Sequence, residues 1–201
     1  MPDTIEEFIN DAKVIINDAQ KTFGELTGEQ LNWKPSPESW GVGQCFDHLI
    51  VTNDLYMKEI QPVADGTHKN NLYSKIPFSA DLTGRLLKKF VSPEFPRKIK
   101  TFSVFEAATS SISETIIEDF CTNQERFISL MEETKDLDTK TIKIPEPISP
   151  LVNIRLIDAF EVTILHEKRH FDQAKRVMQL ENFPGSTSPG LETVGYGRRS
   201  E

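Results

Sequence analysis

Cysteine, long apolar runs and positive charge are all scarce in this chain of 201 residues. Its two cysteines, Cys45 and Cys121, are too few for the disulfide framework of a small secreted protein. The longest apolar runs have three or four residues, whereas a membrane-spanning helix needs about 20. The first residues, 1–4, have neither the basic flank nor the apolar segment of a secretory signal. These absences predict a cytoplasmic, reduced protein that has no membrane partner.

The charge balance predicts which partners the protein avoids. The chain has 31 Asp and Glu residues against 23 Lys and Arg residues, which gives a formal net charge of −8. An acidic surface repels phosphate backbones, and the densest basic patches, at residues 97–100 and 168–176, lack the interleaved aromatic residues that stack on bases. Nucleic acid is therefore not expected as a partner.

Apolar residues recur every three or four positions in four long stretches of the chain. The pattern predicts helices near residues 5–23, 42–61, 111–135 and 154–181. Pro62 is expected to end the second helix, because proline has no N–H to donate and clashes with the preceding turn.

The remaining segments are shorter. A short amphipathic segment covers residues 82–90, residues 141–144 are the one stretch that indicates a strand, and Asn153 is a suitable N-cap for the last helix. Residues 1–184 are therefore expected to form one all-α domain, a four-helix bundle with long connections. Residues 185–201 are rich in Gly, Ser, Thr and Pro, and are expected to form a mobile tail.

Histidine is also scarce, and three of the four histidines share a pattern. His166 and His170 are four residues apart on the predicted last helix, so their imidazoles project from one face, one turn apart. That spacing suits a metal ion with ligands at ~2.0–2.1 Å. Both lie on the apolar, inward stripe of their helix, and His48 lies on the inward stripe of the second helix. The sequence therefore predicts three histidines around one divalent metal ion, with positions open to water and substrate.

Several neighbours of this pattern allow more than one interpretation. An inward histidine is often a core residue rather than a ligand, and that alternative applies to all three. His68 lies in a polar stretch and is expected to be solvated. Cys45, one turn before His48, is better explained as a small buried thiol than as a ligand. Gln44 either bonds a histidine or a metal-bound water, or faces solvent.

Two stretches of the chain resemble the DinB/YfiT-like family of metal-dependent enzymes. The first is NWKPSPESWGVGQCFDHL at residues 32–49, and the second combines DAF at 158–160 with HEKRHFDQA at 166–174. The order of these features also matches, with Trp and Pro first, then one His, then a distant His-x-x-x-His. The resemblance implies a four-helix bundle, often a homodimer, that holds one divalent metal ion, most often nickel or zinc, on three histidines. They match His48, His166 and His170. Some relatives are S-transferases that use low-molecular-weight thiols.

Residues 166–170 also match the zincin motif H-E-x-x-H, in which Glu167 would be the general base. A zincin needs a third ligand downstream, where only Glu181, at a helix end, and Glu192, in the tail, are candidates. This makes the zincin the weaker interpretation. A di-iron bundle needs a second Glu-x-x-His motif, and it is absent because Cys45 stands three residues before His48. If the three histidines bind the metal ion, Glu167 is turned about 100° from His166 on the helix. Its side chain then points toward the surface or toward groups that surround the metal ligands.

The function predicted from the sequence is that of a metal-dependent enzyme acting on a small molecule. The metal ion would activate water, giving a hydrolase, or a substrate thiol, giving a thiol S-transferase. The alternative is a non-catalytic bundle that acts through association, with a structural metal or none. A structural site is closed by a fourth protein ligand, whereas a catalytic site keeps an open position.

Overall fold

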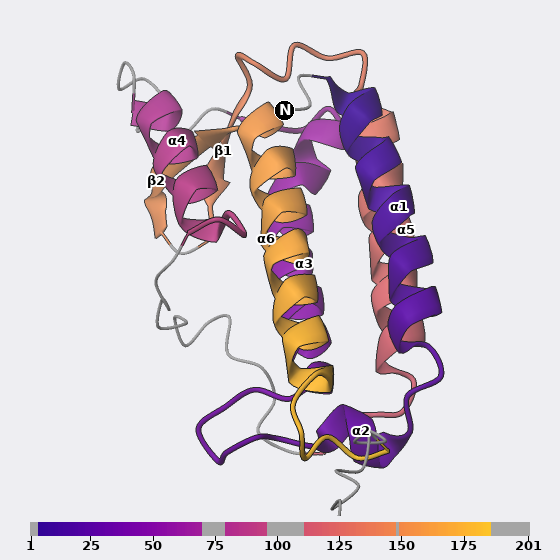
Figure 1. Cartoon of the computed structure of the whole chain (residues 1–201). Helices are drawn as coiled ribbons and strands as arrows, with labels where there is room; N and C mark the ends of the chain where they lie inside the picture. Colours follow the sequence, from indigo (N-terminus) through magenta and orange to yellow (C-terminus); the bar gives the residue numbers. More distant parts are fainter. Residues whose placement is uncertain (1–3, 70–78, 96–110, 148, 186–201) are drawn as a thin grey trace, which may run out of the picture.

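The computed structural model describes residues 4–69, 79–95, 111–147 and 149–185. Its elements are α1 (Ile5–Phe23), α2 (Gly28–Asn32), α3 (Val42–Ala64), α4 (Ser79–Val91), α5 (Ile116–Thr134), β1 (Lys143–Glu146), β2 (Ser149–Arg155) and α6 (Leu156–Met178). Helices α1, α3, α5 and α6 form a bundle (Figure 1), so the predicted helical bundle is confirmed. Apart from Gly185, the predicted tail lies outside the described residues.

The four long helices pack in a closed ring. Helix α3 contacts α5 on one side and α6 on the other, and α1 contacts the same two helices from across the bundle. Helix α2 lies at the end of the bundle where α6 finishes (Figure 1), and there Gln30 Nε2 donates to the carbonyl of Pro184 at 2.9 Å. Residues 135–142 cross the opposite end.

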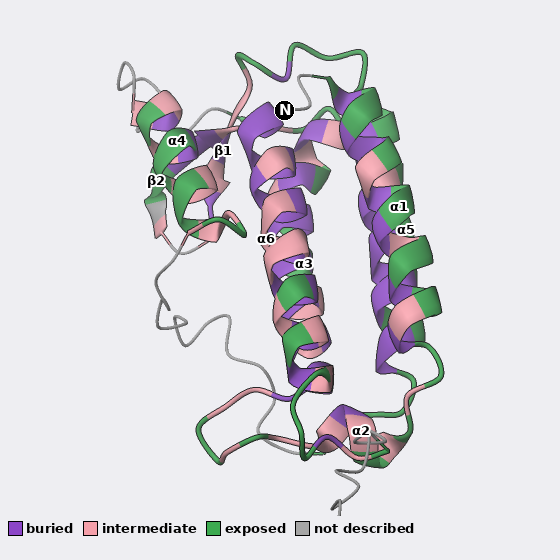
Figure 2. Ribbon diagram, in the orientation of Figure 1, coloured by how far each residue is buried: buried purple, intermediate pink, exposed green. Residues whose placement is uncertain are grey.

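Helix α1 shows how local sequence and packing agree. Thr4 and Glu7 form a reciprocal capping box at its first turn, which satisfies two backbone N–H groups that would otherwise lack partners. Phe8, Ala12 and Ala19 follow at helical spacing and are fully or almost fully buried. Figure 2 shows the outward face of α1 largely exposed and its inward face buried. Burial of one apolar stripe is therefore what holds this helix in the bundle.

A cluster of four phenylalanines fills the core between these helices. Phe46 on α3 meets Phe23, Phe120 and Phe171 edge to face, with ring centroids 5.0, 5.1 and 5.3 Å away. Phe46 lies two residues before His48, and Phe171 directly follows the last histidine of the chain. The cluster thus sets the spacing of α3 and α6 where both carry histidines.

Several helix boundaries differ from the prediction, among them the end of α6, which lies at Met178 rather than near residue 181. Helix α3 continues two residues beyond Pro62, because a proline in the last turn removes only one backbone hydrogen bond. Helix α5 begins at Ile116 rather than near residue 111. The backbone N–H of Ile112 instead donates to Asn32 Oδ1 at 2.7 Å, which ties this segment to α2.

A two-stranded hairpin replaces the expected start of the last helix. Strands β1 and β2 pair antiparallel, with Ile144 opposite Ile154, and both side chains are fully buried. The sequence predicted a strand at 141–144 but not its partner. Because Asn153 is used in this pairing, it is not an N-cap, and α6 begins at Leu156.

The predicted amphipathic segment at residues 82–90 is confirmed as part of α4, which packs on β2 and α6. Gly84 allows the close approach, because a Cβ at that position would lie only 2.5 Å from Asp158 Oδ2. The Asp158 side chain is 2% exposed and pairs with Lys88 Nζ at 2.9 Å. Arg155 Nη2 donates to the same carboxylate at 3.0 Å. A buried carboxylate with two cationic partners therefore fastens α4 to α6.

Replacing Asp158 with alanine is expected to lower the free energy of unfolding by about 2 kcal/mol, because Lys88 and Arg155 lose their buried partner but stay partly hydrated. Urea unfolding measures the loss, and hydrogen exchange should locate it in α4. Asp81→Ala is the matched control, because Asp81 pairs with Arg155 at a more exposed position. Equal losses in the two variants would contradict this role for Asp158.

Within the described part of the chain, each helix is too short or too polar to cross a membrane.

Candidate metal site

Helices α3 and α6 bring together three histidines that are far apart in the sequence. His48 Nε2 lies 3.1 Å from His166 Nε2, and His170 Nε2 lies 3.0 Å from the same atom. His48 and His170 are buried, and His166 is half-buried. All three side chains thus direct the same ring nitrogen to one point between the two helices.

The spacing of the three nitrogens fits a common metal ion. Nitrogen ligands at ~2.0–2.1 Å lie about 2.9 Å apart around an octahedral ion and about 3.3 Å apart around a tetrahedral one. The two Nε2 separations of 3.1 and 3.0 Å fall between these values. These two separations therefore match those of ligands on one metal ion, and the ligand atoms of all three histidines lie within 4.8 Å of one another.

Hydrogen bonding alone does not satisfy these nitrogens. A neutral imidazole nitrogen either donates one proton or offers one lone pair, so His166 Nε2 can make a proper hydrogen bond with only one of its two neighbours. The buried Nδ1 of His170 has no hydrogen-bond partner among the described residues. A cation held by three lone pairs would satisfy the Nε2 atoms together.

The protonation state of the cluster also suits a metal ion. Burial, followed by the charges of His48 and Arg169, holds the pKa of His166 well below its usual value. Burial and the neighbouring histidines lower the pKa of His170 in the same direction. Both imidazoles are therefore neutral at pH 7, which is the form that binds a metal.

No fourth protein ligand completes the cluster among the described His, Cys, Asp and Glu residues. Cys45, the nearest alternative by sequence, is 1% exposed, and burial raises the pKa of its thiol to about 12, with Arg176 lowering it in part. Cys45 is therefore a protonated core thiol. The cluster has the composition of an open site rather than a closed structural one.

The other polar candidates from the sequence lie elsewhere. Gln44 Oε1 accepts a hydrogen bond from the backbone N–H of Gly41 at 3.2 Å, so it caps the start of α3. His68 follows the end of α3, is half-buried rather than solvated, and does not join the cluster.

Glu167 belongs to a buried polar network that sequence reasoning missed. It is 0% exposed, and its Oε1 accepts from Asn53 Nδ2 at 2.9 Å. Asn53 Nδ2 also donates to Asn123 Oδ1 at 3.0 Å, which links α3, α5 and α6 inside the bundle. Glu167 therefore does not face the surface, and its position inside the bundle does not suit the general base of a zincin. Polar residues at inward helix positions were the signal that could have predicted the network.

Burial governs the chemistry of this carboxyl group. Burial raises the pKa of Glu167 to about 8, and the nearby amides of Gln124 and Asn53 offset part of that shift. Glu167 Oε2, Asn53 Oδ1 and both polar atoms of Gln124 are buried without a hydrogen-bond partner among the described residues. A protonated carboxyl matches a cluster with unpaired oxygens better than a carboxylate does, because it supplies a donor.

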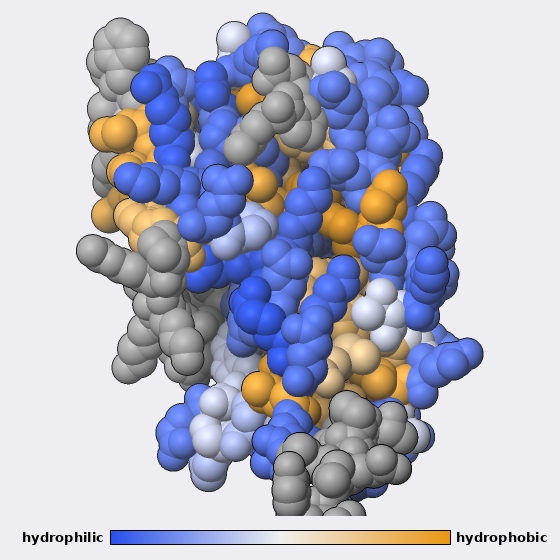
Figure 3. All heavy atoms as spheres, in the orientation of Figure 1, coloured by the Kyte–Doolittle hydropathy of each residue, from blue (hydrophilic) through white to orange (hydrophobic). Residues whose placement is uncertain are grey.

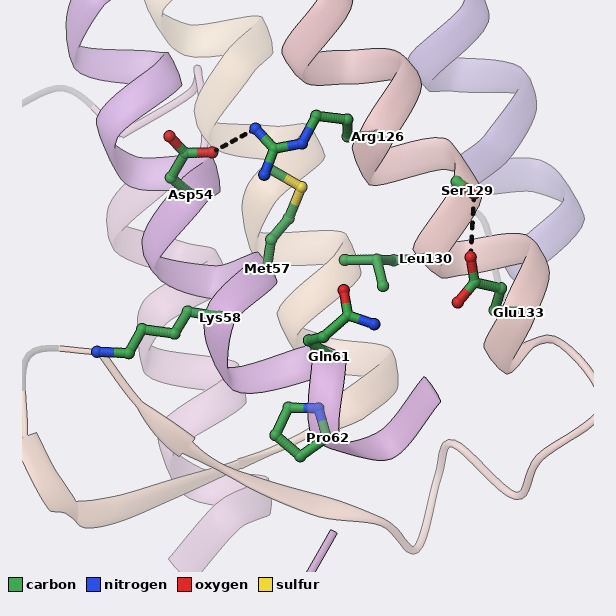
Figure 4. Close-up of a pocket in the computed structure, with 9 residues that line it drawn as sticks. All are labelled: Asp54, Met57, Lys58, Gln61, Pro62, Arg126, Ser129, Leu130 and Glu133. Carbon is green, nitrogen blue, oxygen red and sulfur yellow. Dashed lines mark hydrogen bonds and ion pairs between the residues drawn. The ribbon is translucent and has the colours of Figure 1, made fainter. Parts of the chain in front are cut away.

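A surface groove lies between α3 and α5, away from the histidines (Figure 4). Its volume is about 550 Å³, and it has an apolar floor and a charged rim. The lining residues are Asp54, Met57, Lys58, Gln61, Pro62, Arg126, Ser129, Leu130 and Glu133. Asp54 pairs with Arg126 at 3.2 Å across the groove. None of the three clustered histidines lines it, so it is not part of the candidate metal site.

The sequence was compared with family models, curated proteins and solved structures, and one of the three comparisons gave a match. A family model, described as DinB superfamily, matches residues 14–174. Neither a curated protein nor a solved structure matches the chain. The matched range includes α3, α5 and nearly all of α6, and with them all three clustered histidines.

Proposed function

Because the chain belongs to the DinB superfamily, we propose that it is a metal-dependent enzyme whose metal ligands are His48, His166 and His170. The observation that carries the proposal is the convergence of three Nε2 atoms, with two separations of 3.1 and 3.0 Å, in a cluster with no fourth ligand among the described residues. Nickel and zinc are the proposed metals, since both bind imidazole nitrogen.

The proposed reaction is hydrolysis of a small molecule or transfer of a low-molecular-weight thiol to one. A bound divalent ion would lower the pKa of water or of a thiol and supply a nucleophile at neutral pH. As neutral ligands, the imidazoles of His166 and His170 would leave most of the positive charge on the ion. We also propose that the protein is a homodimer and acts in the cytoplasm.

Elemental analysis of protein purified without a His tag or chelator tests this proposal. The wild type is expected to hold about one metal ion per chain, and His48→Ala, His166→Ala and His170→Ala should each lose it while remaining folded. His68→Ala is the matched control and should keep the metal ion. A metal-free wild type that also fails to bind added Ni²⁺ or Zn²⁺ would refute the proposal.

A second candidate function is association through an apolar face. The exposed large apolar residues of α4 and β2 are Leu82, Leu86, Phe90, Leu151 and Val152. Figure 3 shows hydrophobic residues gathered over these two elements on a face that is otherwise largely hydrophilic. Such a patch is typical of an interaction surface. A purely associating bundle would give the metal-free result in the analysis above.

A further inference from the structure

The indole ring of Trp40 lies against two of the three clustered imidazoles. Its ring centroid is 5.6 Å from that of His170, with the planes only 27° apart, so the two rings stack. The centroid of His48 is 4.9 Å away, at 57°. Among the described residues, Trp40 is the one aromatic side chain outside the cluster whose ring contacts these imidazoles.

The chain around Trp40 is held in place by close backbone packing. The N–H of Gly41 donates to Gln44 Oε1 at 3.2 Å, and the carbonyl of Gly41 accepts from Cys45 N at 3.3 Å, so the residue after Trp40 is joined to the first turn of α3. Gly43 allows this turn to approach its neighbours, because a Cβ there would lie 2.9 Å from the Leu31 carbonyl oxygen. The backbone that follows Trp40 is therefore anchored at the start of α3.

Trp40 supplies an orienting contact for the imidazole ring of His170. A metal-bound histidine usually donates its second ring N–H to a carboxylate or carbonyl, and this bond fixes the plane of the imidazole. His170 Nδ1 makes no hydrogen bond of good geometry among the described residues, although the side chain of Gln173 lies close enough to raise the pKa of His170 in part. The face of the His170 ring is instead held by the indole. An imidazole bound to a cation is also electron-poor, so its attraction to the π face of tryptophan increases when metal binds.

We propose that Trp40 is a positioning residue of the metal site, which holds the imidazoles of His170 and His48 in the orientation that binds the ion. This inference rests on the proposed function. It requires that loss of the indole weakens metal binding although no ligand atom is removed. It also requires that a bound transition metal quenches the fluorescence of Trp40.

The chain has two tryptophans, which makes the experiment specific. Trp33 packs edge to face on Phe183 at 5.6 Å, so Trp33→Phe is the matched control and leaves Trp40 as the single tryptophan, whose emission is excited selectively at wavelengths that tyrosine does not absorb. Titration with Ni²⁺ is expected to quench the emission of Trp33→Phe strongly. The emission of Trp40→Phe, which comes from Trp33, should change much less. Calorimetry with Ni²⁺ gives the affinities of the same proteins.

The expected loss of Ni²⁺ affinity is about 10- to 100-fold for Trp40→Ala, which is the usual effect of removing a group that orients a ligand. Trp40→Leu keeps an apolar side chain over the bundle and should show a similar loss of Ni²⁺ affinity. It replaces Trp40→Ala in the experiment if the alanine variant does not fold. Trp40→Phe should recover most of the affinity because it restores a stacking ring, and Trp33→Phe should bind like the wild type. Wild-type affinity in Trp40→Leu would overturn the role of Trp40 and leave the proposed function intact. Failure of the wild type to bind Ni²⁺ would overturn both.

Discussion

Replacing Glu167 with glutamine is expected to stabilise the metal-free protein at pH 8 by on the order of 4 kcal/mol and to have no effect near pH 4. Glu167 is fully buried, and burial raises the pKa of its carboxyl group from 4.5 to about 8. Glutamine has the same shape as the protonated side chain. It can accept from Asn53 and donate to an oxygen that is unpaired in the wild type.

The sign follows from proton binding in the two states. Below pH 4.5, Glu167 is protonated in both the folded and the unfolded protein, so ionisation carries no penalty. Between pH 4.5 and 8 the unfolded chain ionises first, and the wild type loses about 1.4 kcal/mol of stability per pH unit relative to the variant. Above pH 8 both states are ionised and the difference stays constant.

Urea unfolding of wild type and Glu167→Gln at pH values from 4 to 9, in the presence of a chelator, measures this difference. Histidine titration affects both proteins in the same way, so it cancels in the comparison. Glu118→Gln, the same change at an exposed position of α5, should remain within about 0.5 kcal/mol of the wild type at every pH. Parallel curves for wild type and Glu167→Gln would show that Glu167 does not fold as a neutral acid.

Replacing Phe46 with alanine is expected to lower the free energy of unfolding by about 3–5 kcal/mol. The Phe46 ring is 1% exposed and contacts three other phenylalanine rings from α1, α5 and α6. Its removal would lose apolar burial and edge-to-face contacts at once, and would leave a cavity that four helix backbones cannot close. Urea or thermal unfolding measures the loss.

Phe90→Ala provides the matched control for this prediction. It makes the same chemical change at a ring that is 40% exposed and contacts only Phe95 among the described aromatic residues. Its expected cost is below about 1 kcal/mol. A loss in Phe46→Ala no greater than that in Phe90→Ala would mean that the phenylalanine cluster does not hold the bundle together.

The sequence by itself determined the features that depend on neighbouring residues. Apolar spacing predicted the four long helices and the amphipathic α4, because one turn of helix involves only three or four residues. The capping box of Thr4 and Glu7 at the start of α1 is local in the same way, because its two residues are three positions apart. Helical periodicity also placed His48, His166 and His170 on inward faces. Each of these inferences needs a stretch of chain shorter than a single helix.

Only the tertiary structure decided which of these faces meet. His48 and His166 are 118 residues apart, and their 3.1 Å contact depends on the rotation and axial position of α3 against α6. Helical periodicity determines neither quantity. Local sequence does not predict strand β2, because a strand is stabilised by its partner, and the pairing of Asn153 with Pro145 rules out the expected helix cap.

The burial of Glu167 was decided in the same way. A helix position turned about 100° from an inward histidine can face either solvent or the interior. In the bundle Glu167 accepts a hydrogen bond from Asn53 on α3, which also bonds Asn123 on α5. The stacking of Trp40 on His170 likewise depends on where the segment before α3 folds back. Sequence patterns determine which side chains share a face of a helix. Packing determines which groups that face contacts, because those groups come from distant segments of the chain.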